Sequence, residues 1–118
     1  MKKVFFLSTC NTCTRIIKEV AVDESFETQD IKHEQINAEQ LEALSKIAGS
    51  YEALFSRTAR KYRERNLKEQ TLGEEDYKKL ILEEYTFLKR PVFVIGDKIF
   101  IGNSKKNVQA IKDALKNL

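Results

Sequence analysis

The residues best suited to chemistry are two cysteines, Cys10 and Cys13, in the stretch STCNTC. They are the only cysteines in the 118-residue chain. Their spacing suits three uses: a redox pair, half of a metal site, or two small side chains packed in a core. A zinc site usually takes four ligands, whereas this chain offers one cysteine pair and a single histidine, His33. We therefore predict no bound metal, which leaves the redox pair and the buried pair open.

The position of Cys10 favours the redox pair. The apolar run Val4–Leu7 predicts a short buried strand, and a helix is predicted to begin at Asn11 or Thr12. A helix start presents unpaired backbone N–H groups and the positive end of the helix dipole, and both favour a thiolate. We expect the pKa of Cys10 to lie below its free value of about 8.5, which makes Cys10 the nucleophile. Cys13, one turn further along, is then the resolving thiol. The neighbouring side chains are polar, which is typical of an open turn rather than a core.

Strand and helix patterns alternate along the rest of the chain. Strands are predicted at KKVFFL (2–7), at FETQDIK (26–32) and in a hairpin that PVFVI (91–95) begins and that turns at Gly96–Asp97. In the second of these, Phe26, Thr28 and Asp30 alternate against Glu27, Gln29 and Ile31. Capping boxes are predicted at Asn37 with Gln40 and at Thr71 with Glu74, each opening a helix, and Gly49 ends the first. A last helix is predicted over 104–118. The predicted inward-facing positions of the four helices are Ile16, Ile17, Val20 and Ala21; Leu41, Leu44, Ile47 and Ala48; Tyr77, Leu80, Ile81, Tyr85 and Leu88; and Val108, Ile111, Leu115 and Leu118.

This order of elements predicts the fold class. A strand–helix–strand unit, a helical block and a final hairpin with a helix are typical of a thioredoxin-like (glutaredoxin-like) α/β domain. Its mixed sheet has about four strands, with the first two parallel and the hairpin antiparallel. We predict one domain over residues 1–118, with a helical insertion at roughly 33–89.

Composition and charge exclude several classes of protein. The chain is 42% hydrophobic and 33% charged, as expected for a globular protein, and its net charge of +3 is too small to indicate nucleic-acid binding. Its N-terminal apolar run is shorter than a signal peptide needs, and no stretch approaches the roughly 18 apolar residues of a membrane span. We expect a cytoplasmic protein with no membrane contact, in which thiols stay reduced unless they cycle.

A basic segment lies in the middle of the chain. Between Arg57 and Lys68, the single acid Glu64 accompanies six basic residues: Arg57, Arg60, Lys61, Arg63, Arg65 and Lys68. The segment has two interpretations, an electropositive rim that attracts an anion to Cys10 or a solvated helix face. Its only aromatic residue is Tyr62, so no direct nucleic-acid binding is predicted.

Three stretches together resemble one family. STCNTCTR (8–15), YEALFSRTARKYRERNL (51–67) and LEEYTFLKRPVFVIGDKIFIGN (82–103) are similar to the arsenate reductase (ArsC)/Spx family of thioredoxin-like proteins, in this order and in a chain of this length. The resemblance covers nearly the whole chain.

The resemblance implies roles for individual residues. Cys10 matches the nucleophile that attacks an oxyanion to give a covalent thiol–arsenic adduct, and Arg90 matches the arginine that helps to hold that oxyanion. Pro91 matches the proline that is cis in thioredoxin-like folds. A further anion-binding arginine comes from the middle motif, where we favour Arg57 and keep Arg60 as a candidate. The expected substrate-binding residues are therefore Asn11, Thr12, Arg57, Arg60 and Pro91.

The chain also departs from the reductases, which carry another arginine after the last strand. Lys105 or Lys106 in IGNSKKN is a weak substitute, because an ammonium lacks the planar fork of arginine. The CxxC pair is similar to the Spx branch, whose members switch transcription through that pair and contact RNA polymerase.

The resemblance implies two possible functions. A third possibility is a domain with this fold and no redox use. The favoured one is a cytoplasmic thiol-dependent reductase that acts on an oxyanion or a disulfide. Such an enzyme has no bound cofactor and uses an external thiol reductant, either glutathione with glutaredoxin or thioredoxin. The alternative is a Spx-like redox-sensing transcriptional regulator that binds RNA polymerase through a switch at Cys10 and Cys13.

Overall fold

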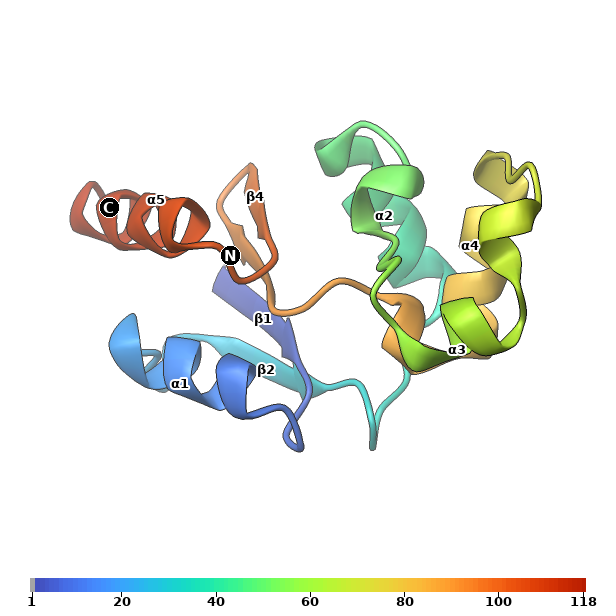
Figure 1. Cartoon of the computed structure of the whole chain (residues 1–118). Helices are drawn as coiled ribbons and strands as arrows, with labels where there is room; N and C mark the ends of the chain where they lie inside the picture. The colour runs from blue at the N-terminus through green and yellow to red at the C-terminus, as the bar shows by residue number, and fades with distance from the viewer. Residues whose placement is uncertain (1) are drawn as a thin grey trace. The chain divides into compact units, whose positions relative to one another are not determined.

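A computed structural model of the chain describes residues 2–118, which belong to two compact units (Figure 1). The first unit comprises Met1–Glu34 and Arg90–Leu118, and the second comprises Gln35–Lys89. The second unit falls close to the helical insertion predicted at roughly 33–89. The prediction of a single domain stays a prediction.

The first unit is built on a four-stranded mixed sheet. Its strands are β1 (Lys2–Phe6), β2 (Glu27–Asp30), β3 (Val92–Ile95) and β4 (Lys98–Ile101), in the order β2-β1-β3-β4. β1 pairs with β2 in parallel and with β3 antiparallel, and β3 pairs with β4 antiparallel. The parallel pair requires a crossover, which α1 (Asn11–Glu19) supplies. The predicted number and directions of the strands are confirmed.

The second strand is shorter than predicted. β2 ends at Asp30, and its buried side chain is Gln29, whereas Thr28 is exposed. Phe26 is buried just before the strand, with its ring edge-on to Phe93 at a centroid distance of 5.9 Å. β2 is an edge strand of the sheet. Phe26 is buried and Thr28 is exposed although both belong to the same predicted alternating set, so simple alternation does not describe which side chains lie inside.

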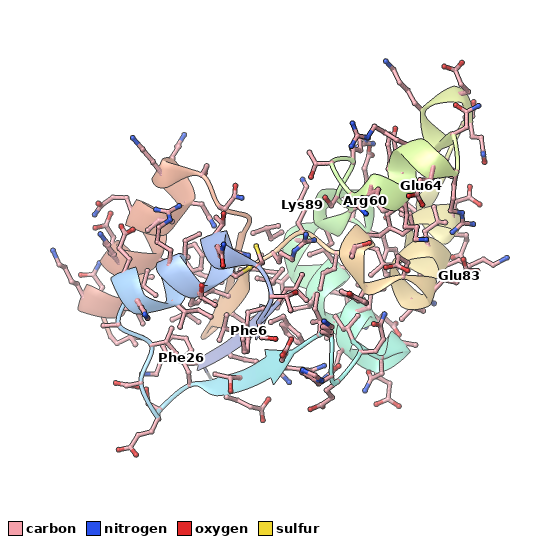
Figure 2. The ribbon with its side chains drawn as sticks, turned by 60° about the horizontal axis from the view of Figure 1, so that its bottom comes forward. Phe6, Phe26, Arg60, Glu64, Glu83 and Lys89 are labelled. Atoms are coloured by element: carbon pink, nitrogen blue, oxygen red, sulfur yellow. The ribbon has the colours of Figure 1, made fainter. Side chains whose placement is uncertain are left out.

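Two helices pack on one face of this sheet. Ile16 of α1, Val20 directly after α1, and Val108 and Ile111 of α5 (Lys105–Lys116) form one cluster with residues of β1 and β3. Figure 1 shows both helices beside the strands, and Figure 2 labels Phe6 and Phe26, which complete this core.

Two predicted core positions in these helices are wrong. Ala21 lies beyond the end of α1 with a positive φ of 57° and is exposed. Leu118 lies beyond α5 and is 73% exposed. In both cases the helix ends before the last predicted inward-facing position.

The predicted hairpin and its turn are confirmed. β3 and β4 are joined by Gly96–Asp97, and Gly96 has a φ of 64°, a conformation that glycine adopts without strain. The Arg90–Pro91 peptide bond before β3 is cis, as the resemblance implies.

The second unit is helical. It contains α2 (Ala38–Ala48), α3 (Arg60–Glu64) and α4 (Glu74–Glu83), with the single-turn 3₁₀ helices η1 (Glu52–Leu54), η2 (Leu67–Glu69) and η3 (Tyr85–Phe87). Phe55 is fully buried at its centre, and its ring contacts those of Tyr62, Tyr77 and Phe87 at centroid distances of 6.0, 4.9 and 5.1 Å. These contacts join α3, α4 and η3 around one aromatic core.

The capping box predicted for α2 is confirmed. Asn37 Oδ1 accepts a hydrogen bond from the Gln40 N–H at 2.8 Å, and Gln40 Oε1 accepts one from the Asn37 N–H at 3.1 Å. Gly49 ends the helix with a φ of 98°. On the buried face of α2, however, Ser45 takes the place expected for Ile47, which is 40% exposed.

The second predicted capping box is wrong. α4 begins after Gly73, whose N–H donates to Asp76 Oδ2 at 2.8 Å. The Glu74 carboxylate instead accepts hydrogen bonds from the N–H groups of Tyr51 and Glu52, at 2.7 and 3.1 Å. A contact with a distant part of the chain therefore replaces the local one. Because α4 ends at Glu83, Tyr85 lies in η3 and is only half-buried.

Over residues 2–118, every helix is too short or too polar to cross a membrane.

We predict that the two proposed caps differ in their effect on stability. Asn37→Ala should lower the free energy of unfolding by about 1 kcal/mol, because the Gln40 N–H then loses its partner. Thr71→Ala should change it by less than about 0.5 kcal/mol, because Thr71 is exposed and does not cap α4. Urea denaturation of both variants measures the difference, and equal losses would contradict this assignment of the caps.

Candidate active site

Cys10 occupies the N-cap position of α1. Its backbone is extended (φ −96°, ψ 111°), its N–H donates to the Leu7 carbonyl at 3.0 Å, and its carbonyl accepts from the Thr14 N–H at 3.1 Å. The first turn of α1 contains no acidic residue, so no side-chain carboxylate in that turn competes for its N–H groups. The predicted position of Cys10 between β1 and the first helix is therefore confirmed.

The surroundings of Cys10 favour its thiolate. Partial burial raises the pKa of Cys10, but the Cys13 N–H, the Cys13 thiol, the positive charge of Arg90 and the Thr12 N–H together outweigh burial. The net effect lowers the pKa below the ordinary thiol value. The direction agrees with the expectation from the helix N-terminus.

Cys13 lies in the opposite electrostatic situation. Its side chain is fully buried, and it comes within 3.6 Å of Cys10. Burial, followed by the nearby charge of Cys10 and its hydrogen bond, raises the pKa of Cys13 to about 11, although the Leu7 N–H and Arg90 act in the other direction. Both cysteines are free thiols. The pair therefore combines one accessible sulfur that ionises readily with one buried sulfur that stays protonated.

Arg90 and Pro91 also belong to the first unit. The positive charge of Arg90 acts to lower the pKa of both cysteines. Pro91 is buried, and its carbonyl accepts a hydrogen bond from the Gly102 N–H at 3.0 Å. The structure thus joins Arg90 to the two cysteines, which lie far from it in the sequence.

Asn11 and Thr12 lie in the first turn of α1. The Thr12 N–H contributes to the lowered pKa of Cys10. Asn11 is exposed, and its carbonyl accepts a hydrogen bond from Thr14 Oγ1 at 3.0 Å. Thr12 therefore acts on Cys10 through its backbone, and the side chain of Asn11 is open to solvent.

Arg57 and Arg60 belong to the second unit. Arg57 Nη2 lies 2.7 Å from Glu52 Oε2 and 3.0 Å from the Tyr77 hydroxyl, and the guanidinium carbon lies 5.6 Å from the centroid of the Tyr77 ring. Glu52 therefore compensates the charge of Arg57 within this unit. Arg60 is exposed at the start of α3, and Figure 2 shows it on the same short helix as Glu64.

Lys105, Lys106 and His33, the other residues weighed in the sequence analysis, are all exposed. Lys105 and Lys106 are exposed in the first turn of α5. His33 is exposed, with Nε2 3.7 Å from Asp30 Oδ2. Among residues 2–118, no three His, Cys, Asp or Glu side chains gather as metal ligands would.

One residue beside the cysteine turn was missed by sequence reasoning. Asp30 Oδ1 accepts a hydrogen bond from the Ser8 N–H, two residues before Cys10, at 3.2 Å. Twenty-two residues separate Asp30 from Ser8, and the parallel pairing of Phe6 with Asp30 brings them together. No local pattern in the sequence signals this contact.

The fold and sequence resemble known proteins over most of the chain. The family model described as "ArsC family" matches residues 5–111. No curated protein sequence matches at a comparable level. Among solved structures, the YffB (PA3664) protein has a TM-score of 0.79 and 21% identity, covering 98% of this chain and 99% of that one.

Two further structures are similar over nearly the same length. SACOL0876 from Staphylococcus aureus COL has a TM-score of 0.71 and 28% identity, covering 93% of this chain and 97% of that one. The arsenate reductase from Vibrio cholerae has a TM-score of 0.73 and 18% identity, covering 93% and 96%. These likenesses confirm the thioredoxin-like α/β fold class.

We predict that Arg90→Ala raises the pKa of Cys10 by on the order of one unit, because the thiolate loses a positive charge that favours it. The pH dependence of iodoacetamide alkylation, with the modified cysteine identified by mass spectrometry, measures this value. Arg15→Ala is the matched control, because Arg15 is exposed and lies 3.7 Å from Glu19, which compensates its charge. An equal shift in both variants, or none in Arg90→Ala, would show that Arg90 does not act on this sulfur.

Proposed function

The chain belongs to the ArsC family, and on this premise we propose that it is a thiol-dependent reductase in which Cys10 is the nucleophile and Cys13 the resolving thiol. The observation that carries the proposal is the opposite ionisation of two neighbouring sulfurs. Cys10 has a lowered pKa at the start of α1, and Cys13, within 3.6 Å, has a pKa raised to about 11.

The first step uses Cys10. With an oxyanion such as arsenate, the thiolate forms a sulfur–arsenic bond while one oxygen of the anion takes up protons and leaves as water. With a disulfide, it forms a mixed disulfide and releases one thiol. Arg90 and the N–H groups at the start of α1 stabilise the negative charge of the bound oxyanion.

The second step uses Cys13 and follows naturally from the first. Once Cys10 is bonded to substrate, its charge and its hydrogen bond no longer raise the pKa of Cys13, whereas Arg90 still lowers it. Cys13 then ionises more readily and attacks the Cys10 sulfur, so that a Cys10–Cys13 disulfide forms and the bond to the substrate breaks. The electron pair of that bond stays on arsenic, which is reduced from As(V) to As(III), or on the departing sulfur, which leaves as a second thiol.

The cycle ends with reduction of the Cys10–Cys13 disulfide by an external thiol, either glutathione with glutaredoxin or thioredoxin. A cycle of this kind operates in a reducing compartment, so we assign the protein to the cytoplasm. No bound cofactor takes part in these steps.

Other substrate contacts rest on the resemblance alone. Asn11, Thr12 and Pro91 flank the reacting sulfur in sequence or in the fold of the first unit and are proposed to line the anion site. The anion-binding roles of Arg57 and Arg60 remain predictions. For Arg57 to bind an anion, its contact with Glu52 at 2.7 Å would have to open or be shared.

A second candidate function uses the same pair. Cys10 and Cys13 lie within 3.6 Å of each other, so an oxidant can join them directly in a disulfide. Oxidation could therefore switch a binding surface without turnover, as in a Spx-like regulator of RNA polymerase. Such a regulator and the reductase differ in whether a substrate is consumed.

We predict that Cys10→Ser lowers turnover below about a thousandth of the wild-type value, because the reacting atom is removed. Cys13→Ser should stop after the first step and accumulate a covalent adduct on Cys10. NADPH consumption with arsenate or a small disulfide, coupled to glutaredoxin or thioredoxin, measures turnover, and intact-protein mass spectrometry detects the adduct.

Arg15→Ala is the control variant for this assay and should keep full activity. Undiminished turnover in Cys10→Ser would refute the proposed nucleophile. If the wild-type chain turned over neither substrate with either reductant but bound RNA polymerase only when oxidised, the regulator would replace the reductase.

A further inference from the structure

We infer that Asp30 is a positioning residue for Cys10, acting through the turn that separates β1 from α1. The inference rests on the proposed role of Cys10 as the nucleophile. The carboxylate lies at the end of the neighbouring strand β2. It is not among the groups named above that shift the pKa of either sulfur.

The strand pairing places Asp30 at the base of this turn. Asp30 is the last residue of β2 and pairs with Phe6, the last residue of β1. The Ile31 N–H donates to the Phe6 carbonyl at 2.9 Å, so the two strand ends are held side by side. The chain leaves β1 at this point toward Cys10.

The Asp30 carboxylate ties this turn to β2. Oδ1 accepts hydrogen bonds from the N–H groups of Ser8 and Lys32, both at 3.2 Å, and the side chain is only 17% exposed. Ser8 thereby gains a fixed partner outside its own turn. The carboxylate connects the second residue after β1 to the second residue after β2.

The same turn supplies backbone groups to both cysteines. The Leu7 carbonyl accepts the Cys10 N–H at 3.0 Å, and the Leu7 N–H lowers the pKa of Cys13. Leu7 is buried and directly precedes Ser8. A loss of the Ser8 contact would therefore loosen the residues that hold Cys10 over the first N–H groups of α1.

Asp30 is ionised at neutral pH. Burial raises its pKa, but hydrogen bonds from Ser8 and Lys32 and the charge of His33 outweigh burial and lower it below the ordinary value. His33 Nε2 lies 3.7 Å from Oδ2, and Lys32 contacts the carboxylate through its backbone N–H. Asp30 contacts the turn before Cys10 through the Ser8 N–H, so we expect its effect on Cys10 to be geometric.

The chain contains a matched carboxylate in a turn far from the cysteines in sequence. Asp23 Oδ1 accepts hydrogen bonds from the N–H of Ser25, at 2.9 Å, and from its hydroxyl. Asp23 and Asp30 both hold a serine N–H in a turn of the first unit. Only the serine bound by Asp30 belongs to the turn that ends at Cys10.

The test measures the pKa of Cys10 from the pH dependence of iodoacetamide alkylation in the full chain, together with the melting temperature. Asp30→Ala should raise this pKa by about half a unit, which is a roughly threefold slower reaction well below the pKa. Asp30→Asn should stay close to wild type, because its amide oxygen still accepts the Ser8 N–H. Asp23→Ala should lower the melting temperature without moving the pKa of Cys10.

The inference is overturned if Asp30→Ala leaves the pKa of Cys10 unchanged while the melting temperature falls as in Asp23→Ala, since Asp30 would then only stabilise the fold. It is also overturned if Asp30→Asn shifts the pKa as much as Asp30→Ala, since the charge would then matter rather than the acceptor. Should Asp30→Ala fail to fold, Asp30→Ser, which also removes the carboxylate, takes its place with the same expected rise in the pKa of Cys10. The readout is ionisation and not turnover, so a failure of the proposed reductase activity would remain distinguishable.

Discussion

The interaction on which the candidate site depends is the hydrogen bonding of one sulfur by the first N–H groups of a helix. Cys10 stands at the N-cap of α1, and the N–H groups of Thr12 and Cys13 favour its thiolate over its thiol. Burial acts against this, and the charge of Arg90 acts with it. The strand before Cys10, the helix after it and the segment that carries Arg90 all have to be in place for the balance to favour ionisation.

The second cysteine gains its properties from the same arrangement. Cys13 lies one turn further into α1, on the face that packs into the core with Ile16, and is fully buried. Burial, and to a smaller extent the charge of Cys10, raise the pKa of Cys13. In the proposed reductase the two thiols would therefore have separate tasks, with Cys10 as the nucleophile and Cys13 as the resolving thiol.

Elements encoded by neighbouring residues were predicted well. The reciprocal hydrogen bonds of Asn37 and Gln40 and the turn at Gly96–Asp97 use partners within three residues, so a local pattern is enough. The errors have more than one source. Glu74 bonds to the distant Tyr51 and Glu52 instead of capping its own helix, whereas Ala21 and Leu118 lie beyond the ends of their helices.

The sequence by itself determined the identity and spacing of Cys10 and Cys13, their place between the first strand and the first helix, and the order of strands and helices that resembles the ArsC family. It could do so because helix caps, turns and alternating apolar residues act over a few positions. Only the tertiary structure decided that Cys13 is buried, that the charge of Arg90 acts on the two sulfurs and that Asp30 holds the Ser8 N–H. These three facts depend on strand pairing and packing between residues far apart in the chain, which no local pattern records.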